Sequence, residues 1–324
     1  MKLLRDVDID PAPLAGKRVA ILGYGNQGRA QALNLHDSGI DVVVGLRGGS
    51  GSTFEAEAAG LRTALVEDAV ASADVVMMLA PDEIHAALYQ EIEPHLREGA
   101  ALGFSHGLSV RFGFIQPRGD LDVFLIAPKG PGTALRSLYT EGKGMLAAWA
   151  VDKDATGNAR GIALAYGRAI GCGRAGLIAT SFAEEAEADL FNEQAVVWGA
   201  VPEILVAGFE TLVSGGVSPE LAYLECVGEL KLLADLIEAR GIAGMREVIS
   251  NTAELGALLG GRRIVDDSVR SRMAEVLAEV RAGRFAGELR QEEASGYARL
   301  ENARRDNRET LIEEIYQRLS DAEG

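Results

Sequence analysis

The sequence predicts an α/β domain built on a doubly wound parallel sheet, followed by an all-helical domain. Up to about residue 180, short runs rich in β-branched residues alternate with segments of helical periodicity, as in a parallel sheet covered by helices. Beyond residue 180 these runs stop, and long segments with a 3.6-residue apolar period follow. We therefore expect a first domain at residues 1–181 and a second at residues 182–324.

The elements of both domains follow from local patterns. Helical segments separate most of the strands in the first domain, and glycine-rich turns separate the helices of the second, at 214–216, 241–244 and 260–261. The candidate strands are short apolar runs at 17–22, 41–46, 74–79, 100–104, 122–127 and 146–151.

Composition excludes several classes of partner. The 324 residues carry a formal charge of −16, with no basic stripe to bind nucleic acid. We see neither a leader at the N-terminus nor a run approaching the roughly 18 to 20 apolar residues that span a bilayer, so we expect a cytoplasmic protein without a membrane partner. Two cysteines and four scattered histidines exclude a zinc cluster, so any metal should be held by oxygen.

A glycine-rich turn follows the first strand and opens a helix. It reads GYGNQG, and its glycines allow a tight turn, close approach of a pyrophosphate to backbone amides, and close packing of helix on strand. A turn that serves packing alone is the alternative, but the position after a first strand favours a dinucleotide. The predicted cofactor-binding residues are Gly23, Tyr24, Gly25, Asn26, Gln27 and Gly28.

The end of the second strand indicates which dinucleotide binds. An NAD site usually places an acid there, whereas this chain has Arg47, Ser50 and Ser52. A guanidinium and two hydroxyls suit a 2′-phosphate, so NADPH is the expected cofactor. A flexible, solvent-exposed turn is the alternative.

Two pairs of carboxylates occur at helical spacing in apolar segments of the second half. Asp189 and Glu193 form one pair, and Glu225 and Glu229 form the other. Buried carboxylates are costly unless their charge is compensated, and hard oxygen ligands at this density suit two Mg²⁺ ions. The alternative is a set of buried salt bridges to distant arginines such as Arg246.

Together with these features, the chain resembles the short bacterial form of ketol-acid reductoisomerase. The resemblance runs from about residue 15 to about residue 265 and is highly specific in the order and spacing of its motifs. The motifs are GYGNQG, GLRGGSGS, LAPDE (79–83), FSHG (104–107), APKGPG (127–132), ADLFNEQ (188–194), LECVGELK (224–231) and SNTAE (250–254).

The resemblance implies a fold, a reaction and an assembly. The fold is a Rossmann domain followed by a knotted all-helical domain, with at least a homodimer as the working unit. The reaction converts a 2-hydroxy-2-alkyl-3-keto acid such as 2-acetolactate to a 2,3-dihydroxy acid, with NADPH and Mg²⁺, in branched-chain amino acid synthesis. Pro81, Asp82 and His106 join the expected cofactor-binding residues.

The same resemblance assigns roles to the acidic residues. Asp189 would bridge two Mg²⁺ ions and Glu193 would ligate the first, while Glu225 and Glu229 would serve the second. Two cations that chelate the oxygens of a hydroxy-keto acid lower the hydroxyl pKa and polarise the ketone, so the scheme is chemically sound. Glu229 is also the plausible proton carrier.

Three further residues complete the expected site. Ser250 would hold the substrate carboxylate, although the cap of a helix N-terminus is an equal alternative. His106 and Lys129 would line the site beside the nicotinamide as catalytic residues. Lys129 follows a strand in a rigid turn that points toward the carboxyl ends of the sheet. His106 has an alternative as a loop residue that caps a strand end.

The chain departs from the family pattern near the expected site. Trp198 stands where a small residue is usual, and we weigh a pocket-lining position, where it would take space from a substrate alkyl group, against a place in the helical core. Thr133 and Arg111 each stand where the family usually has His. Glu247 with Val248 replaces Tyr-Ser, and Leu255 replaces Tyr.

These departures leave alternatives open. A paralogue recruited to a specialised pathway, for example one that closes a sulfonium-bearing diol to a cyclopropanol, would keep the metal ligands and change the pocket. A catalytically silent dinucleotide-binding protein is disfavoured, because it has no reason to bury four acids. The sequence leaves open the true substrate, the strictness of the NADPH preference and the oligomer size beyond a dimer.

Overall fold

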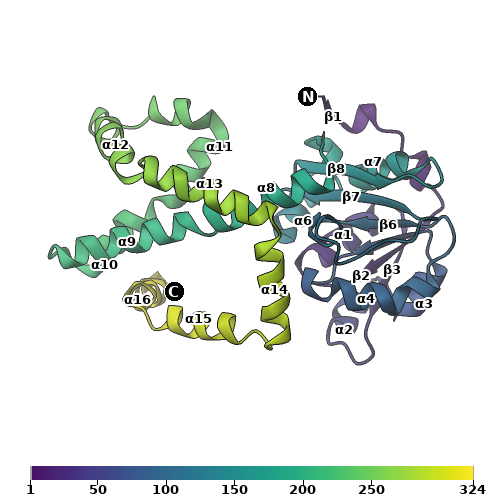
Figure 1. Ribbon diagram of the computed structural model, residues 1–324. Coiled ribbons are helices and arrows are strands. Elements are labelled where there is room, and N and C mark those ends of the chain that lie inside the picture. Colours follow the sequence, from purple (N-terminus) through teal and green to yellow (C-terminus); the bar gives the residue numbers. More distant parts are fainter. Residues whose placement is uncertain (1, 324) are drawn as a thin grey trace. The chain divides into compact units, whose positions relative to one another are not determined.

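The computed structural model describes residues 2–323, which divide into two compact units. The sheet unit extends to Ala186 and the helical unit begins at Glu187. The division falls within helix α8, Phe182–Ala195, so one helix carries residues of both units (Figure 1). Each unit is described separately below.

The sheet unit is built on a nine-stranded sheet with the order β1-β9-β8-β7-β6-β5-β2-β3-β4. The strands from β4 through β2 to β7 are parallel, which confirms the expected doubly wound core. The strands are β1 (Leu3–Leu4), β2 (Arg18–Leu22), β3 (Asp41–Leu46), β4 (Arg62–Leu65), β5 (Val75–Met78), β6 (Ala101–Phe104), β7 (Asp122–Pro128), β8 (Ala147–Lys153) and β9 (Leu177–Ala179).

The edges of the sheet differ from the expectation. The run expected at 146–151 forms β8, but it pairs antiparallel with β7, because α6 leads the chain back to the carboxyl end of β7. Strands β1, β4 and β9 were not predicted. They are two to four residues long and lie at or near the sheet edges, so they carry too few alternating residues to give a signal.

Helices cover both faces of this sheet (Figure 1). Leu35, Leu135 and Tyr166, from α1, α6 and α7, belong to the apolar core on one face, and Val70 and Ile92, from α3 and α4, belong to the core on the other. The helices of this unit are α1 (Asn26–Asp37), α2 (Ser52–Ala58), α3 (Val66–Ser72), α4 (His85–Ile92), α5 (Leu108–Arg111), α6 (Gly132–Thr140) and α7 (Ala159–Ala169).

The helical unit contains no strand among its described residues, as expected. Phe209, Ala222, Ile312 and Ile315 form its buried cluster, which joins α9, α10 and α16. Between α10 and α11 the chain forms a π-helical turn at Leu224–Gly228. The helices are α9 (Ala200–Ser214), α10 (Pro219–Tyr223), α11 (Leu230–Arg246), α12 (Asn251–Ile264), α13 (Asp267–Arg281), α14 (Arg284–Ala294), α15 (Ala298–Arg308) and α16 (Leu311–Glu323).

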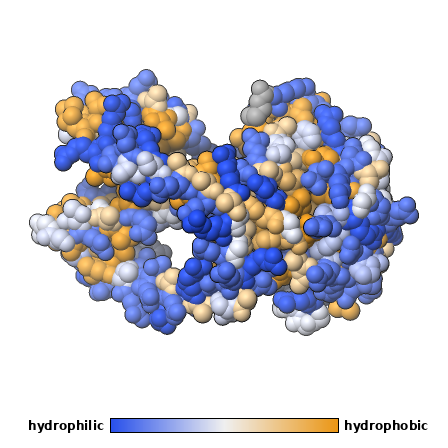
Figure 2. Space-filling view, in the orientation of Figure 1, coloured by the Kyte–Doolittle hydropathy of each residue, from blue (hydrophilic) through white to orange (hydrophobic). Residues whose placement is uncertain are grey.

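The helical unit leaves many large apolar side chains exposed in the single chain (Figure 2). By length and composition, the run Phe182–Ser214 even passes as a candidate membrane span, which corrects the expectation that no such run exists. One candidate span of this kind is weak evidence of a membrane protein, and only 6% of its apolar window is buried. Exposed patches of this kind mark surfaces that contact another protein, a membrane or a ligand.

Candidate active site

A cavity of about 680 Å³ opens at the carboxyl ends of the parallel strands in the sheet unit. Loops after β2, β3, β5 and β6 line it, at the point where the chain direction across the sheet reverses between β2 and β5. Ligands of doubly wound sheets bind at this crevice. The position therefore supports the prediction of a dinucleotide site.

The glycine-rich turn forms one wall of this cavity. Gly23 has a φ of 97°, and a Cβ there would lie 2.9 Å from the backbone nitrogen of Ala80, so a larger residue is excluded on both counts. A Cβ on Gly28 would lie 2.3 Å from the carbonyl oxygen of Gly23. Helix α1 can therefore approach the strand closely, with its N-terminus directed at the cavity.

The predicted cofactor-binding residues gather in one place. All of them except Gly28 line the cavity, and Gly28 instead packs α1 against the turn. Gln27 donates a hydrogen bond to the carbonyl oxygen of Gly130 at 2.9 Å, which ties the turn to the loop that follows β7. Arg47, Ser50 and Ser52 lie on the β3 side of the cavity, where an adenosine ribose would bind.

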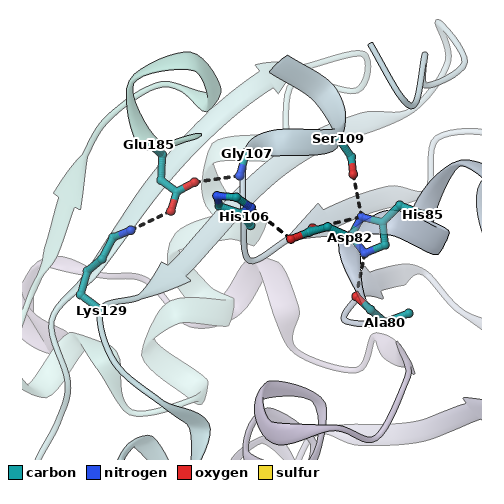
Figure 3. Close-up of polar contacts among 8 residues, drawn as sticks. All are labelled: Ala80, Asp82, His85, His106, Gly107, Ser109, Lys129 and Glu185. Atoms are coloured by element: carbon teal, nitrogen blue, oxygen red, sulfur yellow. Dashed lines mark hydrogen bonds and ion pairs between the residues drawn. The ribbon is translucent and has the colours of Figure 1, made fainter. Parts of the chain in front are cut away.

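At the β5 and β6 ends of the cavity, one carboxylate faces two histidines (Figure 3). Asp82 Oδ2 lies 3.2 Å from His106 Nδ1, and Asp82 Oδ1 lies 3.5 Å from Nδ1 of the buried His85. Burial raises the pKa of Asp82, but the hydrogen bond and charge of His106, with the charge of His85, outweigh it and hold that pKa below its ordinary value. Burial lowers the pKa of His85, although Asp82 opposes the shift.

A second charged group lies beside His106. The buried Glu185 accepts hydrogen bonds from Lys129 Nζ and from the backbone nitrogen of Gly107, each at 2.7 Å (Figure 3). This carboxylate thus joins the loops after β6 and β7, and one of its oxygens lies within 4.8 Å of a ring nitrogen of His106. Lys129 directly follows the carboxyl end of β7 but is not among the residues that line the cavity.

Sequence reasoning did not identify Glu185 as a site residue. A signal was available, because Glu185, Asp189 and Glu193 follow one another at four-residue spacing along α8 and therefore share one face of the helix. Asp189 lies one helical turn after Glu185 on α8 and is half-buried. The carboxylate of Asp189 offers the hard oxygen donors that Mg²⁺ prefers.

The remaining predicted ligands are not brought together in one chain. Glu193, Glu225 and Glu229 are exposed, which corrects the expectation that both pairs point into a buried face. Within residues 2–323, no group of three or more candidate ligand side chains includes Glu225 or Glu229. Leu221, Leu224 and Leu232, the large apolar residues nearest to Glu225 and Glu229 in sequence, are also exposed in the part of the chain that the structure describes.

The two predicted substrate-binding residues have clear local structures. Ser250 is the N-cap of α12 and accepts a hydrogen bond from the backbone nitrogen of Ala253 at 3.1 Å, so the capping alternative is realised. Trp198 lies in the turn 196–199 that separates α8 from α9, and it is 68% exposed. The alternative of a buried core residue is therefore wrong for the single chain, while the pocket-lining position stays a prediction.

Family models match nearly the whole chain. Residues 13–176 match the acetohydroxy acid isomeroreductase NADPH-binding domain, and residues 182–323 match the ketol-acid reductoisomerase C-terminal domain. Among solved structures, the chain is similar to an NADH-preferring ketol-acid reductoisomerase from an uncultured archean. The two are 41% identical, the match covers 99% of each chain, and the TM-score is 0.96.

More distant structures share the fold alone. One is an NAD-binding semialdehyde dehydrogenase protein from Cupriavidus necator, 19% identical over 82% of this chain and 99% of that chain, with a TM-score of 0.62. Another is the pyrroline carboxylate reductase of Plasmodium falciparum, 12% identical over 83% of this chain and 98% of that chain, with a TM-score of 0.55.

Proposed function

We propose a reaction for this chain from one premise, that it belongs to the ketol-acid reductoisomerase family and is an NAD(P)-dependent oxidoreductase of that type. The proposed reaction is the alkyl migration of a 2-hydroxy-3-keto acid, with 2-acetolactate as the substrate, coupled to reduction by NADPH. Its product is a 2,3-dihydroxy acid of branched-chain amino acid synthesis, made in the cytoplasm. The recruited-paralogue alternative gains no support from the comparisons.

The observation that carries the proposal is the group of polar side chains at one end of the dinucleotide cavity. His106 lines the cavity, and Lys129 donates to Glu185, whose other oxygen accepts from the backbone nitrogen of Gly107, the residue after His106. An imidazole and an ammonium at this position suit proton exchange with substrate oxygens beside a nicotinamide. Glu185 orients the Lys129 ammonium and offsets its charge.

The proposal includes NADPH and two Mg²⁺ ions. When bound, NADPH supplies the hydride and the metal ions supply the positive charge that polarises the substrate ketone. Asp189, Glu193, Glu225 and Glu229 would hold the ions, and Glu229 would also carry a proton. Ser250 keeps a hydroxyl proton to donate to the substrate carboxylate even while its oxygen caps α12.

The choice of NADPH over NADH is a separate part of the proposal. Arg47, Ser50 and Ser52 support it, because a guanidinium and hydroxyls bind a 2′-phosphate. The similar archaeal enzyme is described as NADH-preferring, so direct measurement is required. The ratio of kcat/KM values for NADPH and NADH decides this point.

We also propose a homodimer formed by the helical unit. Leu221, Leu224 and Leu232 are 48 to 59% exposed around the exposed Glu225 and Glu229. A second copy would cover this apolar face and would bring the two acids into a site that one chain leaves incomplete. The knotted path of the helical unit stays a prediction of the family resemblance.

The test is turnover of 2-acetolactate by the purified protein with NADPH and Mg²⁺, followed at 340 nm and by product analysis. We expect stoichiometric oxidation of NADPH and formation of the dihydroxy acid, with loss of both after chelation. NADPH oxidation without the dihydroxy acid would contradict the proposed isomerisation. If no reaction occurred with any divalent metal ion, the proposal that 2-acetolactate is the substrate would be contradicted.

A further inference from the structure

We propose that Asp82 is a positioning residue for His106: its carboxylate holds the imidazole as the Nδ1–H tautomer, which makes Nε2 the ring atom that exchanges a proton. The inference rests on the proposed function only in giving His106 a part in the reaction. It concerns the arrangement in Figure 3, in which His106 lies between Asp82 and the Lys129–Glu185 pair.

The geometry of the pair comes from the parallel sheet. Asp82 follows β5 and His106 follows β6, so adjacent parallel strands bring both side chains to the same edge. Their contact joins Asp82 Oδ2 to His106 Nδ1 at 3.2 Å. Both side chains are mostly buried, at 29% and 16% exposure, so little water competes for this contact.

The charge state of Asp82 decides which atom is the donor. The two histidines keep the pKa of Asp82 below its ordinary value in spite of burial, so the group is a carboxylate at neutral pH. A carboxylate only accepts hydrogen bonds. The proton in the contact therefore belongs to His106 Nδ1, and a neutral ring then carries its lone pair on Nε2.

His85 occupies the other side of Asp82 without competing for this role. Its Nε2 lies 2.9 Å from the carbonyl oxygen of Ala80, which only accepts, so Nε2 carries a proton. In the neutral ring, Nδ1 accepts from the hydroxyl of Ser109 at 2.9 Å. His85 thus lies buried on the other side of Asp82, while His106 donates the hydrogen bond that Asp82 accepts.

The chemistry resembles the way a buried carboxylate orients a general base. A carboxylate that holds one ring nitrogen selects the tautomer, fixes the ring plane and stabilises the imidazolium that forms when the other nitrogen takes a proton. An asparagine of the same shape loses this selection, because its amide can accept from or donate to the ring. The two roles of Asp82, in orienting His106 and in lining the cofactor cavity, can then be separated by experiment.

The test measures the tautomer directly. Full-length protein labelled with ¹⁵N-histidine contains four histidines, and His106→Gln identifies the signals of His106. At a pH where the ring is neutral, ring nitrogen shifts and two-bond couplings give the tautomer. We expect the Nδ1–H form in the unchanged protein and a shift toward the Nε2–H form in Asp82→Asn.

A neighbouring acid provides the control. Glu83→Gln removes the same charge one residue further along the chain and should leave the tautomer unchanged. Asp82→Asn should lower kcat for 2-acetolactate by about 10- to 100-fold, part of the roughly 10² to 10⁴ that general acid–base catalysis contributes, while the Kd for NADPH changes little. A role in cofactor binding alone would instead raise that Kd and leave kcat intact.

Three outcomes would overturn the inference. They are an Nε2–H tautomer in the unchanged protein, an unchanged tautomer in Asp82→Asn, and an equal shift in Glu83→Gln. The spectroscopic result requires no turnover. If the protein failed to convert 2-acetolactate but showed the expected tautomers, the proposed function would fail while the positioning of His106 by Asp82 would stand.

Discussion

The two units of this chain differ in how much of their apolar surface a single copy buries. In the sheet unit, the strands from β5 to β7 are buried along their whole length, and both faces carry apolar cores. In the helical unit, the buried cluster has four members, and leucines of α11 and α12 such as Leu232 and Leu259 are 59% and 64% exposed.

The difference separates two parts of the chemistry. The dinucleotide cavity, Asp82, His106 and Lys129 belong to a unit that is complete in one chain. Most of the proposed metal-binding carboxylates belong to a unit that exposes them. Cofactor binding should therefore survive changes that abolish metal binding or assembly.

The largest expected effect comes from Asp189→Asn. The variant should lose turnover by at least about a thousandfold, or about 4 kcal/mol of transition-state stabilisation, while the Kd for NADPH stays nearly unchanged. Steady-state kinetics and NADPH fluorescence measure the two quantities. Asp235→Asn, which removes an exposed acid paired with Lys231, is the control. Full activity after rigorous chelation would show that the reaction needs no metal ion and would contradict the prediction.

Leu232→Asp should break the assembly. A charge placed in a covered apolar interface costs about 3 kcal/mol or more, a factor of about a hundred in the dimer dissociation constant. Light scattering should then show monomers, with turnover lost and NADPH still bound. Val7→Asp is the control, because Val7 is 94% exposed on the sheet unit. An unchanged dimer would show that this face of α11 is not the interface.

Glu185→Gln tests the link between the loops of the sheet unit. The amide can still accept from the Gly107 nitrogen but no longer compensates Lys129, so we expect kcat to fall by about tenfold or more and stability to fall by about 1 to 3 kcal/mol. Kinetics and thermal unfolding measure these changes. The adjacent Glu184→Gln removes an exposed acid, and an equal loss there would argue for a general effect of charge.

The double variant Ser50→Asp, Ser52→Asp tests the cofactor loop alone. Two carboxylates should repel a 2′-phosphate and shift the ratio of kcat/KM values for NADPH and NADH toward NADH by about tenfold. The dimer and the metal requirement should not change. If the ratio stayed constant, residues elsewhere in the cavity would distinguish NADPH from NADH.

The smallest effect is expected at Trp198. Cysteine there should raise kcat/KM for 2-acetolactate severalfold, because pocket complementarity for one or two methylenes is worth roughly 1 to 3 kcal/mol. Compensating changes at Thr133, Glu247 and Leu255 would then add to the gain. If Trp198→Cys weakened the dimer and left kcat/KM constant, the exposed indole would belong to the interface instead.

Local patterns in the sequence were sufficient for the parallel core of the sheet and for the cofactor cavity. The five parallel strands predicted and the glycine-rich turn follow from short-range rules. Buried parallel strands are continuous apolar runs, and Gly23 has a positive φ next to the Leu79–Ala80 backbone. The pairing direction of β8 was not predictable in this way, since it depends on where a connection returns the chain. Glu185 was missed because its partners, Lys129 and the Gly107 nitrogen, are distant in sequence.

The helical unit shows that local patterns do not predict which helix faces are buried. A 3.6-residue period identifies which residues share a face, but not whether the same chain or another one covers that face. The prediction that Glu225 and Glu229 are buried assumed that the chain covers its own apolar stripe. The single chain exposes both.

The π-helical turn at Leu224–Gly228 changes which residues lie on the apolar face of the helix. Each α-helical residue advances the side chains by about 100°, whereas a turn closed by i→i+5 bonds advances them less, so the faces before and after the turn are out of phase. Such wide turns are rare and are frequently found at functional sites. Removing one residue, for instance Val227, would restore a regular helix and rotate everything beyond it. The turn thus acts as a one-residue spacer that sets where α11 points its side chains, independently of their identity.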